Sequence, residues 1–287
     1  QVNKIVIEDS HAKGVECIDS DNNSFTLHAS KEVILSSGAF GSPQILLRSG
    51  VGPANGIVRH GINHLVDLPG VGKNLQDHID YITVHKYSSM KLIGFSLKNI
   101  LFKYPYEILK YLFTKTGLFT STIAEAGAFI KTKDELDIPN IQFHYAPAMI
   151  VDHGRTLLWG TGMSCHSCLL RPKSLGEVTL ASADPFADPL IDPKFLSHPD
   201  DMKDMIDGYK VMMRVLGSEP FSKYITEHTQ RPIDINNDAD IEQAMREGAD
   251  TVYHPVGTCK MGDDDMSVVD SRLKVHKVNG LRVVDAS

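Results

Sequence analysis

The chain has 287 residues and a formal net charge of -7, with 42% hydrophobic and 23% charged residues. This length suggests about two domains, and the composition is that of an ordinary globular protein. The mildly acidic balance excludes the basic footprint of a nucleic-acid-binding protein, and no apolar run approaches the ~18 residues that a transmembrane segment needs.

The four cysteines are Cys17, Cys165, Cys168 and Cys259. They are too sparse for a disulfide scaffold, so the sequence predicts a reducing compartment and a cytoplasmic protein. Cys165 and Cys168 have C-x-x-C spacing but no second ligand pair that would complete a zinc site. The alternation around them indicates a strand that carries the two thiols on opposite faces. We therefore predict buried free thiols and no metal.

The first 37 residues contain four short β-branched or alternating stretches that are separated by turn-forming residues, which is typical of hairpins. The fourth stretch, residues 32–36, is apolar at consecutive positions, as in a strand covered on both faces. Ser42 and Pro43 then predict the start of a helix, and Gly50 its end. The turn between this strand and this helix is where α/β folds bring ligands.

Residues 67–80 combine turn-forming residues with little periodicity and predict an ordered loop. Residues 96–115 mix aromatic and aliphatic side chains with four lysines, and Pro105 should break their helical pattern. This segment could rest on a membrane surface. Rings that pack inward while the lysines reach outward are the more ordinary alternative.

The middle of the chain predicts a largely antiparallel sheet, followed by helices over residues 200–216 and 238–248. The predicted fold class is therefore α/β and α+β. A central domain with an antiparallel sheet and flanking helices is expected from residues 81–250, and residues 1–80 and 251–287 are expected to be two pieces of another domain.

His254 lies in the stretch "YHPVGT" near the end of the sequence. Histidine is the side chain whose ordinary pKa lies nearest neutrality, so it is a natural candidate for moving a proton. Gly257, three residues later, allows close approach by another group. The chain has 13 histidines, and a structural or solvated role is the ordinary alternative.

Four stretches together resemble the flavin-dependent glucose–methanol–choline (GMC) oxidoreductases. They are "KEVILSSGAFGSPQILLRSGVGP", "DLPGVGKNLQDH", "YHPVGTCKMG" and "LRVVDAS", in that order. Residues 38–52 match one of the signature patterns of the family. The resemblance covers essentially the whole chain, and within the family it favours bacterial dehydrogenases of aliphatic alcohols, with choline dehydrogenases next.

The resemblance implies a partial FAD-binding, Rossmann-like domain from residues 1–80 and 251–287 and a substrate-binding domain from residues 81–250. It also implies FAD as cofactor and a small alcohol as substrate, with a quinone or another carrier as electron acceptor. His254 matches the catalytic proton acceptor. The residues expected to contact FAD are Gly38, Ala39, Asn74, Asp77, His78, Asp285 and Ala286. The implied location is cytoplasmic, with peripheral contact to the inner membrane as a further possibility.

The sequence also departs from the family. The strand–G-x-G-x-x-G–helix unit that holds the ADP part of FAD is absent, as is the stretch that carries a second catalytic His or Asn. We therefore expect the chain to be a fragment, inactive by itself, of an alcohol dehydrogenase. Choline dehydrogenase, with Glu125, Phe143 and Tyr145 as candidates for binding the ammonium group, is one alternative. A non-enzymatic binding or structural module is the other.

Overall fold

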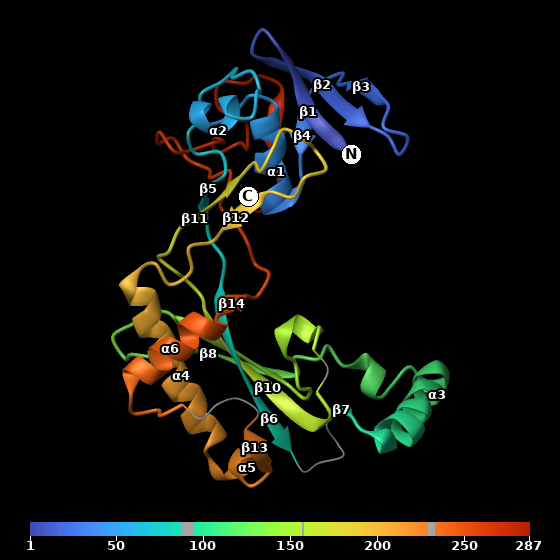
Figure 1. Cartoon of the computed structure of the whole chain (residues 1–287), viewed down its shortest axis with the longest axis vertical. Coiled ribbons are helices and arrows are strands. Elements are labelled where there is room, and N and C mark those ends of the chain that lie inside the picture. Colours follow the sequence, from blue (N-terminus) through green and yellow to red (C-terminus); the bar gives the residue numbers. More distant parts are fainter. Residues whose placement is uncertain (88–93, 157, 229–232) are drawn as a thin grey trace. The chain divides into compact units, whose positions relative to one another are not determined.

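The structure is a computed structural model, and it describes residues 1–87, 94–156, 158–228 and 233–287. The chain forms two compact units (Figure 1). Unit 1 consists of residues 1–77, 174–197 and 253–287, and unit 2 of residues 78–173 and 198–252. Unit 1 thus includes residues 174–197, which lie within the range that the sequence analysis assigned to a substrate-binding domain.

Unit 1 contains short sheets around two helices. The β1-β2-β3 sheet and the β12-β11-β5 sheet are antiparallel, whereas β4 and β15 pair in parallel. The elements of this unit are β1 (Val2–Glu8), β2 (His11–Ile18), β3 (Ser24–His28), β4 (Val33–Leu35), α1 (Gly38–Arg48), α2 (Ala54–Val58), β5 (Lys73–Leu75), β11 (Gly176–Thr179), β12 (Leu190–Asp192) and β15 (Leu281–Val283).

The four predicted strands at the start of the chain are confirmed, but two expectations beside them are wrong. The strand β4 is not covered on both faces, because Val33 and Leu35 are buried while Ile34 is 54% exposed. The helix α1 begins at Gly38, four residues before the predicted start at Ser42. Ser42 does not cap the helix, because its hydroxyl donates to Asp285. Gly50 follows the end of α1 as predicted.

Unit 2 is built on one curled antiparallel sheet, with strand order β13-β6-β10-β9-β8 and with β14 and β7 paired to β6 and β10. The elements of this unit are β6 (Ile79–Tyr87), β7 (Gly94–Phe95), η1 (Asn99–Lys103), α3 (Tyr104–Thr114), η2 (Leu118–Thr120), β8 (Ala126–Ile130), β9 (Ile141–Ala146), η3 (Asp152–Gly154), β10 (Gly160–Leu169), α4 (Pro199–Leu216), α5 (Glu219–Ser222), β13 (Ile225–His228), α6 (Asp238–Gly248) and β14 (Asp250–Thr251).

The helices α4 and α6 cover one face of this sheet (Figure 1). Both were predicted, and both begin at a side-chain cap: His198 accepts from the backbone N–H of Asp200, and Asn237 from that of Ala239. Gly208 allows α4 to lie close to the sheet, since a Cβ there would be 3.0 Å from side-chain atoms of Ile141. The side chains on this face of the sheet are therefore shielded from water by the two helices.

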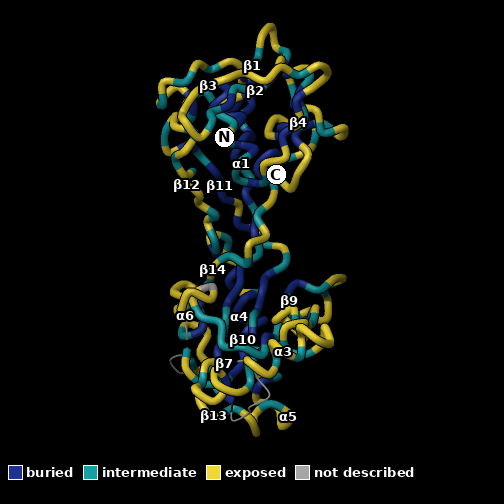
Figure 2. Tube along the Cα trace, turned by 90° about the vertical axis from the view of Figure 1, so that its right-hand side faces the viewer, coloured by how far each residue is buried: buried dark blue, intermediate teal, exposed yellow. Residues whose placement is uncertain are grey.

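The segment 96–115 changes its helical form where the sequence predicted a break. A π-helical turn, η1, ends at Lys103, and α3 follows with Pro105 in its first turn. The expectation that the rings pack inward is wrong, because none of the described residues of α3 is buried (Figure 2). Among the described residues, no helix is long and apolar enough to cross a bilayer.

Candidate active site

The segment around His254 runs beside the loop that follows β5. Gln76 and Val256 exchange two backbone hydrogen bonds, with N···O distances of 2.9 and 2.8 Å. The backbone N–H of His254 donates to Oδ1 of the buried Asp77 at 2.9 Å. The residue His254 is exposed. These contacts fix the backbone of His254 at an exposed position of unit 1.

Gly257 is required by the close approach of Asn74. Gly257 has φ +92°, and a Cβ at this position would lie 2.6 Å from the backbone oxygen of Asn74. The side-chain amide of Asn74 also donates to the carbonyl of Gly257 at 2.9 Å. The sequence predicted a close neighbour at this glycine, and the structure identifies it as Asn74.

Thr258 joins the same segment to α1. Pro43 lies inside α1 and has no N–H to donate to the carbonyl of Ala39, four residues before it. The hydroxyl of Thr258 donates to that carbonyl at 2.6 Å, and Thr258 is fully buried. One side chain thus satisfies the helix carbonyl that the proline leaves without its usual donor.

Asp285 holds the start of α1 from the end of β15. Its Oδ2 accepts from the backbone N–H of Gly38 at 2.9 Å and from the Ser42 hydroxyl at 2.5 Å. Burial favours the neutral acid, but hydrogen bonds from Ser287, Ser42 and Gly38 outweigh it and lower the pKa of Asp285 below its ordinary value. A carboxylate at a helix N-terminus is also favoured by the helix dipole.

Open space remains beside the turn at Gly38. A Cβ at Gly38 would meet no heavy atom of the described chain within 4 Å, and this residue has φ +78°. Ala286, next to Asp285, uses its carbonyl to accept from the N–H of Gly257 at 3.0 Å. Small residues from two distant parts of the sequence therefore border an accessible surface at the carboxyl ends of β4 and β15.

The structure thus brings together, in unit 1, most of the residues that the sequence singled out: His254, Gly38, Ala39, Asn74, Asp77, Asp285 and Ala286. His78 is half-buried and is the first residue of unit 2. Ser42 and Thr258 were not predicted as site residues. Nothing in the sequence pairs a threonine with a carbonyl 219 positions away, so only the fold reveals their roles.

Unit 2 contains a cavity of about 360 Å³ on the sheet face opposite α4. Its lining residues are Asp80, Ile82, Val84, Ile150, Val151, Asp152, Leu158, Gly248, Asp250 and Thr251. Asp80 is 3% exposed and binds two neighbours from β10. Its Oδ2 lies 2.6 Å from Nδ1 of His166, and its Oδ1 accepts from the Cys168 thiol at 3.1 Å.

The thiols of the C-x-x-C motif lie on opposite faces of β10, as predicted. Cys168 pairs with Asp80 on the neighbouring strand β6. Cys165 pairs with Thr83 of the same strand, and the hydroxyl of Thr83 lies near Met212 of α4. All four cysteines are buried and free. Burial raises the pKa of both thiols far above the ordinary range, with the charge of Asp80 adding to the effect at Cys168. These thiols are therefore structural.

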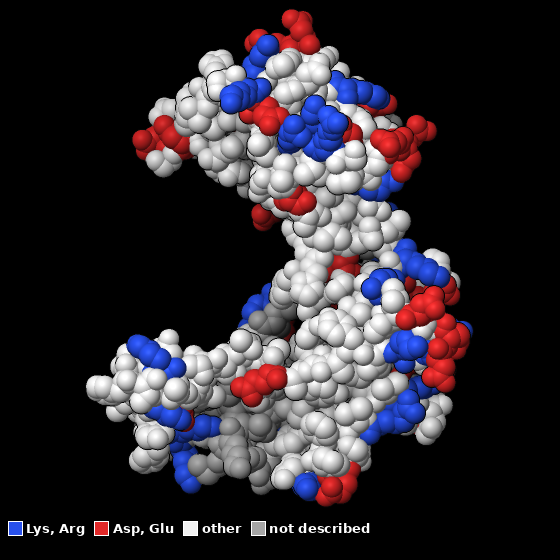
Figure 3. Space-filling view, turned by 180° about the vertical axis from the view of Figure 1, so that it is seen from behind, with Lys and Arg blue, Asp and Glu red and all other residues white. Residues whose placement is uncertain are grey.

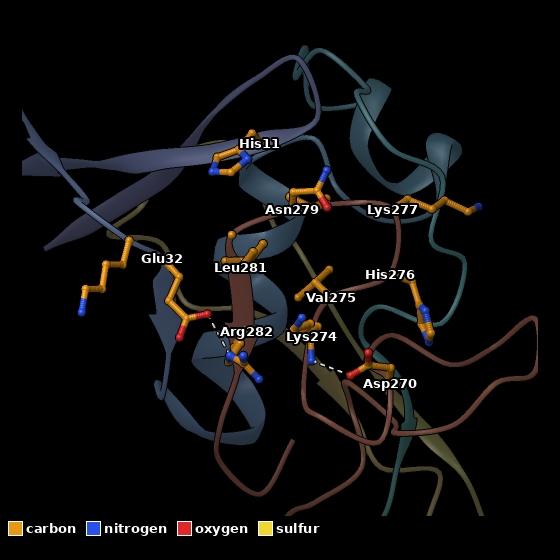
Figure 4. Close-up of a pocket in the computed structure, with 13 residues that line it drawn as sticks. His11, Glu32, Asp270, Lys274, Val275, His276, Lys277, Asn279, Leu281 and Arg282 are labelled. Atoms are coloured by element: carbon orange, nitrogen blue, oxygen red, sulfur yellow. Dashed lines mark hydrogen bonds and ion pairs between the residues drawn. The ribbon is translucent and has the colours of Figure 1, made fainter.

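A second hollow, of about 640 Å³, lies in unit 1 (Figure 4). Several of the charged side chains that line it already have partners: Arg282 binds Glu32 at 2.8 Å, and Asp270 accepts from the backbone N–H of Lys274 at 2.9 Å. The predicted site residues do not belong to its described lining. The hollow is therefore a weaker candidate for the reaction site than the surface around His254.

Comparison with known proteins identifies relatives along the whole chain. Residues 1–80 and 172–287 match two family profiles, both described as GMC oxidoreductase. The alcohol dehydrogenase [acceptor] of Pseudomonas putida is 42% identical, over 99% of this chain and 51% of that protein. The oxygen-dependent choline dehydrogenase of Cronobacter sakazakii is 36% identical, over 99% and 51%. The chain spans about half the length of these curated relatives.

Solved structures agree with these matches. The formate oxidase of Aspergillus oryzae RIB40, studied for its FAD modification, superposes with a TM-score of 0.89 at 28% identity, over 100% of this chain and 55% of that one. The pyridoxine 4-oxidase from Mesorbium loti has a TM-score of 0.83 at 23% identity, over 100% and 52%, which shows the fold alone. The predicted fold class is confirmed.

Replacing Thr258 by valine should destabilise unit 1. Valine keeps the shape of threonine but leaves the Ala39 carbonyl without a donor, which costs about 1–3 kcal/mol when the group is buried. Urea unfolding followed by circular dichroism measures this loss. Thr26→Val, at an exposed position of β3, is the matched control and should change the free energy of unfolding little. Equal stability of the two variants would contradict the role given to Thr258.

Asp285→Asn should lower the free energy of unfolding at neutral pH, because the amide cannot accept from every group that donates to the carboxylate. Since the folded-state pKa of Asp285 lies below its unfolded value, this stabilisation is present above the unfolded pKa of about 3.9. It is lost as the pH falls through the folded-state pKa. Urea unfolding measured across this pH range should show that the difference in the free energy of unfolding between the variant and the parent becomes smaller in acid. The exposed Asp188→Asn should show no such gap.

Proposed function

Because the chain belongs to the GMC oxidoreductase family, whose members bind FAD, we propose that it is part of a dehydrogenase that oxidises a primary aliphatic alcohol to an aldehyde. The arrangement of His254 beside the small-residue surface of unit 1 is the observation that carries this proposal. The 42% identity to an alcohol dehydrogenase supports the choice of substrate.

The chemistry of the residues around α1 fits FAD. Gly38 and Ala39 offer a turn without bulky side chains, and Asp285 and Ala286 border it. Asn74, Asp77 and His78 complete the proposed contact set. When bound, FAD supplies the acceptor for the hydride of the alcohol. The N–H of Gly38 already donates to Asp285, so it is not available to bind the cofactor. We therefore propose that this turn contacts the cofactor by close packing.

His254 is the proposed proton acceptor for the substrate hydroxyl. A general base must lie within hydrogen-bond reach of the proton that it removes, and an exposed histidine on a fixed backbone is compatible with that need. The imidazole would take the hydroxyl proton, and the bound cofactor would supply the acceptor for the hydride of the same carbon. The buried Asp77 holds the backbone of His254 in place, which keeps the ring in one region of the site.

The cavity of unit 2 supports a neutral substrate. Aliphatic side chains line much of it, and each of its three carboxylates has a partner within the protein. Asp80 binds His166 and Cys168, Asp152 binds Arg155 at 2.6 Å, and Asp250 accepts from the backbone of Thr251 at 2.7 Å. An aliphatic substrate needs no charged group in the cavity. A quaternary ammonium would have to compete with these protein groups for the three carboxylates.

Choline is the second candidate, since the choline dehydrogenase relative is 36% identical and the cavity is acidic. The residues expected to form an ammonium site do not support it. Phe143 is 2% exposed, Tyr145 stacks on Phe221, and Glu125 is exposed. Neither ring belongs to the described lining of the cavity.

For the electron acceptor we propose a quinone or another membrane carrier, and for the location the cytoplasm with peripheral contact to the inner membrane. Both proposals rest on the resemblance to bacterial dehydrogenases. Release of hydrogen peroxide during turnover would instead indicate an oxidase that uses O₂.

His254→Gln in the full-length protein should lower kcat by about 10²–10⁴-fold, because the positioned base is lost. The visible flavin absorbance should be retained, since glutamine keeps the backbone contact to Asp77. Turnover is measured with a medium-chain alcohol and an artificial electron acceptor. His28→Gln, at an exposed position of β3, is the control and should leave kcat unchanged. Full activity of His254→Gln with bound flavin would exclude this residue as the base.

A competition between a medium-chain alcohol and choline should favour the alcohol in kcat/KM. The reason is that the cavity offers aliphatic surface and carboxylates that are already hydrogen-bonded. A clear preference for choline would replace the first candidate by the second while leaving the role of His254 intact.

A further inference from the structure

The helix α3 exposes its apolar side chains. Tyr106, Leu109 and Phe113 lie at i, i+3 and i+7 and share one face. Leu112 lies next to Leu109, and Ile108, one turn before Leu112, lies at the edge of this face. Their exposed fractions range from 46% for Ile108 to 84% for Phe113. Phe102, in the preceding turn, is 70% exposed. We call these six residues the α3 surface.

The opposite side of α3 is the one that contacts the rest of the chain. Glu107 accepts from the backbone N–H of Leu118 at 2.8 Å, and the ring of Tyr111 lies 6.4 Å from that of Phe119. The hydroxyl of Tyr104, in the first turn, donates to the carbonyl of Gly94 at 2.7 Å. The more polar side of α3 therefore contacts the rest of the chain, and its apolar side faces solvent.

The segment that carries the α3 surface is positively charged, with an exposed lysine at each end. Residues 96–115 contain four lysines and one glutamate, for a local charge of +3 in a chain whose net charge is -7. Lys98 and Lys115, at the two ends of the segment, are exposed, and Lys103 and Lys110 are half-buried. In Figure 3 the part of unit 2 at the lower left is largely white, with clusters of blue lysine and arginine atoms.

We propose that the α3 surface docks on a lipid bilayer that contains anionic headgroups. An amphipathic helix with aromatic and aliphatic residues on one face and lysines at its ends and on its polar side lies in the plane of such an interface. The lysines complement the negative charge of the leaflet. At 11 residues, α3 is about 16 Å long, too short to cross the ~30 Å hydrocarbon core. The helix lies on the membrane and does not span it.

Vesicle flotation with the full-length protein tests this proposal. The probes are vesicles of phosphatidylcholine alone and of an equal mixture of phosphatidylcholine and phosphatidylglycerol. The protein should float with the mixed vesicles and bind the neutral ones more weakly. Phe102→Ser and Phe113→Ser should each weaken binding about tenfold, as expected for the loss of one buried ring. Phe186→Ser, at an exposed phenylalanine of unit 1, is the matched control and should bind like the parent.

The charge contribution is tested separately. Lys98→Glu and Lys115→Glu should each weaken binding to the mixed vesicles at least about fivefold. Lys13→Glu, an exposed lysine of β2, should have a smaller effect. Binding that responds equally to all three substitutions would reflect net charge alone and would overturn the proposal, as would absence of flotation with either vesicle.

A labelling experiment distinguishes the bilayer from a protein partner. The four cysteines of these 287 residues are buried, so an environment-sensitive maleimide dye that labels Phe113→Cys beyond the level of the parent protein reports the introduced thiol. The dye should react readily in vesicle-free solution, and its emission should shift to the blue when mixed vesicles are added. Failure to label the folded protein would show that protein covers this face. Conversion of a dimer to a monomer by Phe113→Ser would show that a second copy does so. Either result would overturn membrane docking.

Discussion

The candidate site depends on one hydrogen bond, which the side chain of Thr258 donates to the carbonyl of Ala39. Pro43 removes the N–H that would normally bond this carbonyl, and a buried carbonyl without a donor is costly. Thr258 supplies the donor from the segment that carries His254. The first turns of α1 and the histidine are therefore held together by one side chain, and Gly257 lets Asn74 approach the same segment from the other side.

Asp285 completes this arrangement from the end of β15. The parallel pairing of β4 with β15 brings residues 33–35 and 281–283 together, so the ends of both strands meet at the start of α1. The carboxylate then binds Gly38 and Ser42, which ties the two strand ends to the helix. Three stretches that are distant in the sequence thus border one surface, at the carboxyl ends of parallel strands, where α/β folds commonly bind ligands.

Features with a local cause could be predicted from the sequence. The short strands of residues 2–35 follow from alternation between turns, and α4 and α6 from helical periodicity after a capping residue. The start of α1 could not be predicted, because Ser42 and Pro43 form a valid local start signal that the long-range contacts of Ser42 and Ala39 override. Likewise, the sequence predicted a helical pattern broken at Pro105 within residues 96–115, but whether the rings face protein or solvent depends on what packs around them. Asp80 looked unremarkable in the sequence because its partners lie on another strand.

The sheet of unit 2 separates two environments, and the C-x-x-C motif shows how. Residues three apart on a strand point to opposite faces, so Cys165 lies on the side of α4 and Cys168 beside Asp80. On the α4 side, Gly208 and the buried Met205 and Met212 allow tight packing that excludes water. On the other side, a buried carboxylate must be compensated, and His166 and Cys168 do so. The aliphatic side chains that line the neighbouring cavity therefore lie beside a carboxylate whose two oxygens already have partners within the sheet.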